Sequence, residues 1–182
     1  MIEICERVSA TTFFGSARRT MKKIQPWLGL AARLILGGTL IVAGYLKFDE
    51  LDKSQMAVRA YEMLPISLAN FLGIVVPFFE LAVGILLVIG AAVRISGALS
   101  ALLMIGFMIA ISQAWARGLS IDCGCFGGGG QVPEGEANYL TPLLRDTGLA
   151  LLGIYLTLFP HTKFGLDKSP APATQLGESN NG

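Results

Sequence analysis

Histidine is nearly absent from this chain, since His161 is the only one among 182 residues. A single histidine excludes bis-histidine haem ligation within one chain and leaves too few ligands for the usual zinc shells. The three cysteines do not change this conclusion. Cys123 and Cys125 supply only half of a tetrahedral shell, and Cys5 is distant in sequence. The sequence therefore predicts no metal site.

Charge is also scarce. Only 15% of the residues are charged, and the net charge is +1. The chain lacks the basic surface that phosphate contacts require, which argues against a nucleic-acid partner. Hydrophobic residues make up 53% of the chain, and the mean hydropathy is +0.60. This composition is too apolar for an ordinary soluble domain and predicts a protein of the lipid bilayer.

Four apolar runs are long enough to cross a bilayer core as helices, which takes about 20 residues each. They cover residues 27–46, 68–92, 95–115 and 139–159. Inside lipid, a helix satisfies its own backbone hydrogen bonds, and these runs lack the polar faces that a soluble bundle needs. The predicted fold class is therefore all-α, an integral membrane four-helix bundle.

The sequence divides into three parts around this bundle. Residues 1–26 are basic and predict a loose tail or a short surface helix, and residues 27–160 contain the four spans. Residues 161–182 are rich in proline, alanine, serine, asparagine and glycine, which predicts a disordered tail.

Basic residues predict the orientation of the spans in the plasma membrane. Five of them precede the first span, Arg94 lies in the second connection, and Lys163 and Lys168 follow the last span. The connections 47–67 and 116–138 carry more acidic than basic residues. Because cytoplasmic flanks are enriched in lysine and arginine, both termini are predicted to face the cytoplasm. The connection that contains the two neighbouring cysteines then faces the outside, where disulfides persist.

That connection contains Asp122-Cys123-Gly124-Cys125-Phe126-Gly127, followed by three more glycines. Two thiols one residue apart can close a small, strained disulfide ring, and strained disulfides are reduced more easily than structural ones. Gly124 gives the backbone the unusual dihedral angles that such a ring demands. The motif fits a redox-active pair, but it also fits a static bridge or two free thiols in a tight turn. The extracytoplasmic placement favours the redox-active pair.

Ionisable residues inside the spans are candidates for function because a buried charge is costly. Arg33 shares a helix face with two glycines, and Glu80 lies one turn after Pro77. We expect Arg33 and Glu80 to pair across the bundle, with Lys47 as a competing partner of Glu80. Such a pair would either fix the helix register or line a pocket for a quinone head group or a proton path.

Arg145 stands about one turn inside the start of the last span, next to Asp146. A cation beneath the cysteine loop, the connection 116–138, would stabilise a thiolate and lower the pKa of the thiol. The alternative is an interfacial arginine whose side chain reaches the lipid head groups. Tyr61, Trp115 and Tyr139 are predicted to anchor the outer membrane boundary.

Several of these motifs together resemble a known family. They are the segments 33–37 and 43–47 of the first span, 61–65 and 77–84 around the second, the cysteine motif 122–127, and 144–146 of the last. Over residues 27–160 the chain resembles the DoxX-like membrane proteins and, within them, the methylamine utilisation (MauE) branch. The combination of the cysteine motif with Pro77 and Glu80 is the more specific part of the resemblance.

The resemblance implies a four-helix membrane bundle that works with an extracytoplasmic thioredoxin-like protein in making or reshuffling disulfides. In the methylamine pathway, this work matures the small subunit of methylamine dehydrogenase. The first hypothesis is thus a thiol–disulfide oxidoreductase, with Cys123 and Cys125 as the reacting pair. Arg145, Gly124 and Asp122 would tune or shape the pair, and a quinone would be the simplest electron acceptor. The direction of electron flow stays open, since the protein could oxidise or reduce its partner.

Two other hypotheses stay open. In the second, the protein is a non-catalytic membrane scaffold or assembly factor whose Cys-Gly-Cys bridge holds the outer loop for docking. In the third, it is a small transporter with Arg33 and Glu80 on the path. The absence of inverted repeats and the small size disfavour the transporter.

Overall fold

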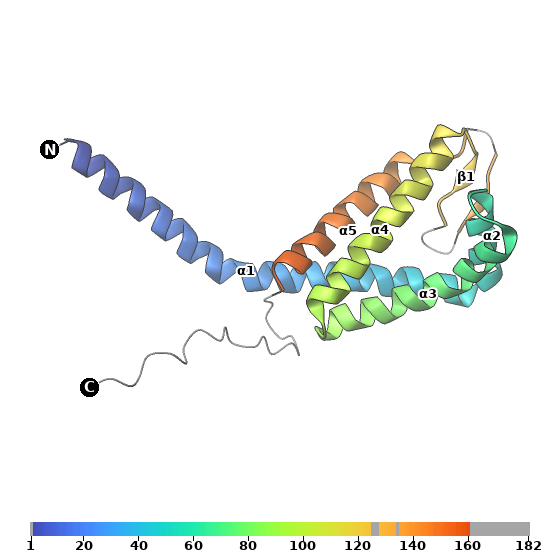
Figure 1. Cartoon of the computed structure of the whole chain (residues 1–182), viewed down its shortest axis with the longest axis horizontal. Helices are drawn as coiled ribbons and strands as arrows, with labels where there is room; N and C mark the ends of the chain where they lie inside the picture. The colour runs from blue at the N-terminus through green and yellow to red at the C-terminus, as the bar shows by residue number, and fades with distance from the viewer. Residues whose placement is uncertain (1, 125–127, 134, 161–182) are drawn as a thin grey trace, which may run out of the picture.

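The computed structural model describes residues 2–124, 128–133 and 135–160, with side chains from residue 25 onward (Figure 1). Its elements are α1 (Ile2–Asp49), α2 (Leu51–Ala60), α3 (Ile66–Ile89), α4 (Val93–Ala116), β1 (Ile121–Asp122), β2 (Gly130–Gln131) and α5 (Leu140–Leu158). The predicted all-α class is confirmed in these ranges, where the strands are two residues each. Cys125, the tail 161–182 and the side chain of Cys5 lie outside the described part.

Three helices are long and apolar enough to cross a membrane, namely Gln25–Asp49 of α1, α3 and α4. They lie close to the spans predicted from hydropathy. α5 has 19 residues, but Arg145 and Asp146 near its start reduce its apolar character, and it falls outside this set. The three apolar helices indicate a bilayer environment.

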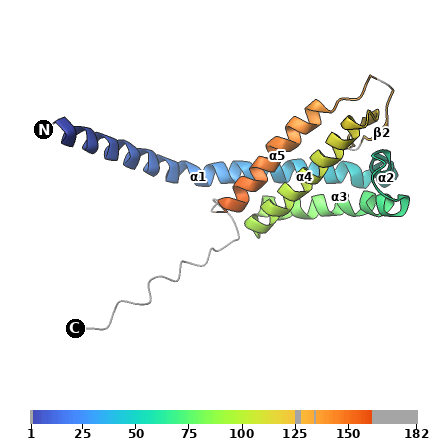
Figure 2. The same cartoon turned by 45° about the horizontal axis from the view of Figure 1, so that its top comes forward.

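The helices pack as two antiparallel pairs, α1 with α3 and α4 with α5, and contacts between α3 and α4 and between α1 and α5 join the pairs (Figure 2). Large apolar side chains face outward: Phe71 is 58% exposed and Leu102 is 67% exposed. Charged side chains lie inside, as the burial of Arg33 and Glu80 shows. A helix bundle with apolar side chains on its surface and charged side chains in its interior is suited to a lipid environment and poorly suited to water.

Small residues allow the helix backbones to approach closely. A Cβ atom added at Gly37 would lie 2.9 Å from the carbonyl oxygen of Gly84, and one added at Gly97 would lie 3.0 Å from that of Gly153. Glycines at such crossings permit van der Waals packing of helices in lipid. The approach of Gly37 to Gly84 also fixes the register of α1 against α3, which positions the charged residues described below.

The N-terminal segment differs from the expected loose tail or short surface helix. α1 begins at Ile2 and continues without interruption to Asp49, with Pro26 inside it, and its first half projects away from the packed helices (Figure 1). The segment before Pro26 contains no proline. Pro26 leaves one carbonyl of α1 without its helical donor, but the helix can extend through the proline-free segment before it because each further residue there completes a hydrogen bond.

α2 was not predicted from the sequence. It covers part of the connection 47–67 and lies at the same end of the molecule as β1 and β2, opposite the end where α5 finishes (Figure 1). Ser54 and Ala57 of α2 are buried. α2 packs against α3 and contacts β2, so it links the cysteine loop to the helices.

Candidate functional site

Cys123 follows β1 directly and is held by a hydrogen bond to its backbone. β1 pairs with β2 in antiparallel register, with Asp122 opposite Gly130. The hydroxyl of Tyr61 donates to the carbonyl oxygen of Cys123 over 3.0 Å. Arg117 in turn donates to the carbonyl oxygen of Tyr61 over 3.0 Å. These bonds position Cys123, whose side chain is partly exposed.

Gly124 shows the unusual backbone that the sequence predicted. Its φ is +65°, in the left-handed region that favours glycine. A Cβ atom at this position would lie 2.8 Å from Cβ of Ala57 in α2. Any other residue here would therefore strain the backbone and collide with α2. Cys125, the proposed partner of Cys123, lies outside the described residues, so the pairing of the two sulfurs stays a prediction.

Pro77 explains how α2 is attached. Proline has no N–H, so the carbonyl of Gly73, four residues earlier in α3, lacks its helical donor. The hydroxyl of Ser54 supplies that hydrogen bond over 2.8 Å. A Cβ atom on Gly73 would lie 2.6 Å from Cα of Gln55, so α2 lies directly on α3. Side-chain hydroxyls commonly satisfy backbone groups freed by proline in membrane helices.

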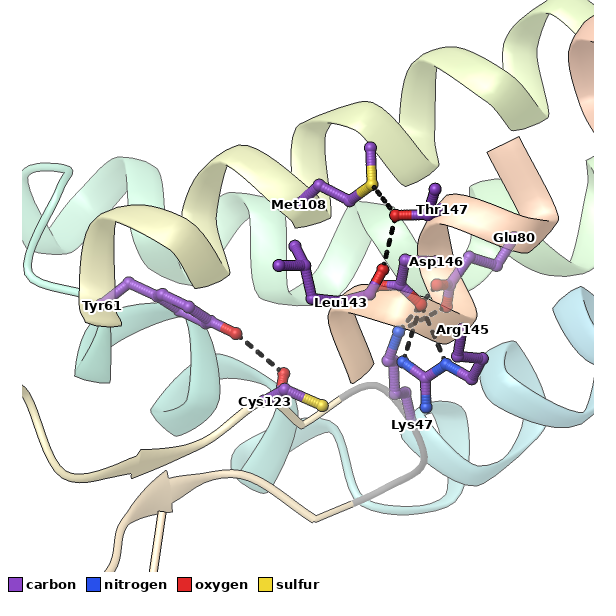
Figure 3. A network of polar contacts seen from close by, with 9 residues as sticks. All are labelled: Lys47, Tyr61, Glu80, Met108, Cys123, Leu143, Arg145, Asp146 and Thr147. Atoms are coloured by element: carbon purple, nitrogen blue, oxygen red, sulfur yellow. Dashed lines mark hydrogen bonds and ion pairs between the residues drawn. The ribbon is translucent and has the colours of Figure 1, made fainter. Parts of the chain in front are cut away.

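A cluster of four charged residues occupies the interior where α1, α3 and α5 meet (Figure 3). The ammonium of Lys47 donates to both carboxylate oxygens of Glu80, over 2.7 and 2.9 Å. Arg145 donates to Oδ1 of Asp146 over 2.9 Å. Two cations and two anions balance one another. The ion pairs therefore compensate the burial of Lys47 and Glu80, whose side chains are 7% and 1% exposed.

The expected pair of Arg33 with Glu80 is wrong, and Lys47, the competing partner, pairs with Glu80 instead. The guanidinium of Arg33 donates through Nε to the carbonyl oxygen of Leu87 over 2.8 Å and through Nη2 to that of Val88 over 3.0 Å. These carbonyls belong to the last turn of α3, where helical donors run out. Arg33 therefore caps the C-terminus of α3.

The direction of helical side chains accounts for this choice. Side chains lean toward the N-terminus of their own helix. In the antiparallel pair of α1 and α3, Lys47 and Glu80 therefore lean toward each other, whereas Arg33 and Glu80 lean apart. The rise per residue alone gives about 9 Å between the levels of Arg33 and Glu80. That estimate ignores the direction in which the two side chains lean.

A cavity of about 260 Å³ connects the cysteine loop with the charged cluster. Cys123 and Gly124 line it on the loop side, and Lys47 lines it from α1. The remaining lining comes from α2, from the segment after it, and from α3 and α4, and is predominantly apolar. Of the three charged residues predicted to line a quinone pocket, Lys47 lies on this cavity, whereas Arg33 and Glu80 do not.

Sequence reasoning missed the contributions of Ser54 and Tyr61 to this site. The signal for Ser54 was present, because Pro77 leaves one carbonyl in α3 that requires a donor. Tyr61 was interpreted as an interface anchor, yet its hydroxyl holds the backbone of Cys123. Arg145 lies on α5 and bonds to Asp146, and its predicted tuning of the cysteine pair stays a prediction. Asp122 is exposed in β1.

Comparison with known proteins gives a consistent result. A family model described as "Methylamine utilisation protein MauE" matches residues 25–159. The chain is also similar to methylamine utilization protein MauE of Paracoccus denitrificans, with 30% identity over 129 residues, or 70% of this chain and 69% of that protein. No solved structure matches the chain.

Proposed function

This chain belongs to the MauE family of methylamine utilisation proteins, and we propose that it serves that process as a membrane thiol–disulfide oxidoreductase. Cys123 and Cys125 would exchange disulfides with an extracytoplasmic thioredoxin-like protein. The observation that carries the proposal is the fixed position of Cys123, partly exposed and bonded through its backbone to Tyr61. A partly exposed cysteine whose backbone is held in place suits thiol–disulfide exchange.

The proposed topology is a four-helix membrane bundle with both termini in the cytoplasm. The basic residues 7, 18, 19, 22 and 23 precede the first span, and Arg94 lies in the turn between α3 and α4. α2 and β1, which leads directly into Cys123, share the opposite end of the molecule (Figure 1). Because lysine and arginine mark cytoplasmic flanks, this arrangement supports an extracytoplasmic cysteine loop.

The exchange proceeds through a mixed disulfide. A thiolate of the partner attacks one sulfur of the Cys123–Cys125 disulfide, and the other cysteine leaves as a thiolate. The second thiolate of the partner then attacks the mixed disulfide and releases the reduced pair. The partner loses two electrons and two protons, and the cysteine pair gains them. Each turnover therefore leaves a dithiol that must be reoxidised.

A second candidate function is a non-catalytic assembly factor. The close packing of Gly124 on Ala57 favours it, because that packing also suits a purely structural loop. In this candidate, a static Cys123–Cys125 bridge holds the loop in shape for a docking partner. The two candidates differ in whether a sulfur of the pair ever bonds to another protein.

Trapping the mixed disulfide separates the candidates. In a Cys5→Ser background, Cys123→Ser and Cys125→Ser are expressed singly and together, and cell extracts are compared by non-reducing electrophoresis and mass spectrometry. The oxidoreductase proposal predicts that one single variant accumulates an adduct with a thioredoxin-fold protein and that the double variant does not. A loss of stability without any adduct in either single variant would contradict the proposal and favour the assembly factor.

A further inference from the structure

The cavity between the cysteine loop and the charged cluster has the character of a small-ligand site. Its volume of about 260 Å³ lies just below the range of about 300–1,000 Å³ that is typical of sites for drug-sized ligands. It therefore suits a single substituted ring and is too small for a dinucleotide. The lining is apolar apart from a few groups, among them the ammonium of Lys47.

We propose that this cavity binds the head group of a lipid-soluble quinone, which reoxidises the dithiol. The inference rests on the proposed function, because that function leaves Cys123, which lines the cavity, as one thiol of a dithiol after each turnover. The ligand must be apolar enough to occupy a site between membrane helices, and it must accept two electrons and two protons. A quinone meets both requirements. The two thiols become a disulfide, and the quinone takes up their electrons and protons as the quinol.

Lys47 provides the polar contact expected for a quinone carbonyl. An ammonium has three N–H donors, and Glu80 accepts two hydrogen bonds from Lys47. The third donor makes no hydrogen bond within the described part of the chain. The same ammonium lies 4.9 Å from the ring centre of Phe107, which also lines the cavity. A carbonyl oxygen in the cavity would satisfy the third donor, and the ring would pack on apolar side chains.

A groove on the outside of the helices gives the ligand a route from the bilayer. Phe79 of α3 and Leu102 of α4 line it, and it shares Gly106 and Phe107 with the cavity. Leu102 is 67% exposed, as expected for a side chain on a lipid-facing surface. Because Gly106 has no side chain, it leaves the wall between groove and cavity thin. The groove therefore offers a lipid-soluble ligand a lateral approach to the cavity.

Gly106 also provides the test. A Cβ atom added at Gly106 meets no atom within 4 Å, and the same holds for Gly148 of α5, which does not line the cavity. Gly106→Leu therefore adds a bulky side chain where the cavity and the groove meet, without a clash at Cβ, and Gly148→Leu is the matched control. Both changes replace a helical glycine, which removes a residue of low helix propensity.

The measurement is the thermal unfolding midpoint of the purified full-length chain in lipid nanodiscs, followed by tryptophan fluorescence, with and without decylubiquinone. We expect the quinone, at about 100-fold above Kd, to raise the Tm of the wild type and of Gly148→Leu by roughly 5–10 °C. Gly106→Leu should show no rise. n-Decylbenzene, which has the tail without the carbonyl oxygens, should leave every Tm unchanged. No quinone-dependent rise in the wild type, or an equal rise in Gly106→Leu, would overturn the site.

A second variant tests the role of Lys47 without leaving Glu80 unpaired. The double variant Lys47→Met/Glu80→Gln should bind decylubiquinone about tenfold more weakly, the loss expected for one hydrogen bond to a charged group. Unchanged affinity would overturn the assignment of Lys47. Quinone binding requires no cysteine, so it is also measured in Cys123→Ser/Cys125→Ser. Quinone binding without a trapped adduct would support the quinone site and contradict the proposed oxidoreductase function. A trapped adduct without quinone binding would contradict the quinone site alone.

Discussion

Lys47→Met is expected to lower the free energy of unfolding by about 3–5 kcal/mol, the usual cost of removing one partner from a buried ion pair. The reason is the charge that remains. Glu80 is 1% exposed and receives both hydrogen bonds from Lys47. Without Lys47, the carboxylate stays buried among membrane helices without its counter-ion. Unfolding of the detergent-solubilised protein by increasing mole fractions of dodecyl sulfate measures the change.

Two controls show whether the lost ion pair is the cause. Lys47→Met/Glu80→Gln removes both charges and should recover most of the loss, because no unpaired charge remains. Lys53 and Glu50 form an exposed pair at 2.7 Å, with side chains 57% and 44% exposed. Lys53→Met should therefore cost less than about 1 kcal/mol. A double variant no more stable than Lys47→Met would contradict the pairing of Lys47 with Glu80.

Arg33→Leu is expected to lower the free energy of unfolding by about 2–4 kcal/mol, because it removes hydrogen bonds from a charged donor to two carbonyls. Those carbonyls, of Leu87 and Val88, end α3 inside the bundle. Arg33→Lys keeps the charge but loses the planar fork that reaches both oxygens, so its loss should be intermediate. The same dodecyl sulfate titration measures both variants.

Gly90 provides an independent check on this cap. Its φ is +77°, and a Cβ atom there would lie 2.5 Å from Nη2 of Arg33. Gly90→Ala should therefore cost about 1–3 kcal/mol from backbone strain and more from the collision with the guanidinium. In an Arg33→Ala background the collision disappears while the strain remains. If Gly90→Ala cost the same in both backgrounds, the contact between the two residues would be disproved.

The sequence was a good guide to the long helices because hydrophobic runs of that length have few alternatives in lipid. The position of Pro77 in the sequence identifies a carbonyl of α3 that lacks a helical donor, and the hydroxyl of Ser54 donates to that carbonyl. The positive φ of Gly124 was also predictable, since a tight cysteine turn demands it. These features depend on local sequence or on a single backbone rule.

Features that depend on three-dimensional register were not predictable. The choice of Lys47 over Arg33 as partner of Glu80 follows from the lean of side chains on antiparallel helices and from the carbonyls in the last turn of α3, which accept from Arg33. The sequence did not predict α2, because the burial of its apolar residues becomes apparent only when α2 is packed against α3 and β2. The sequence did not predict the cavity, because it contains 22 glycines and does not distinguish Gly106 from the others. Only the packing of the helices shows which glycine lines a cavity.

The most direct test of the central proposal is the accessibility of the cysteine pair in intact cells. In a Cys5→Ser background, a membrane-impermeant maleimide is added before and after treatment with a membrane-impermeant reductant, and Cys123→Ser/Cys125→Ser serves as the unlabelled control. An exchangeable extracytoplasmic disulfide predicts labelling from outside only after reduction. Labelling only after the membrane is permeabilised, or labelling without any need for reduction, would contradict it.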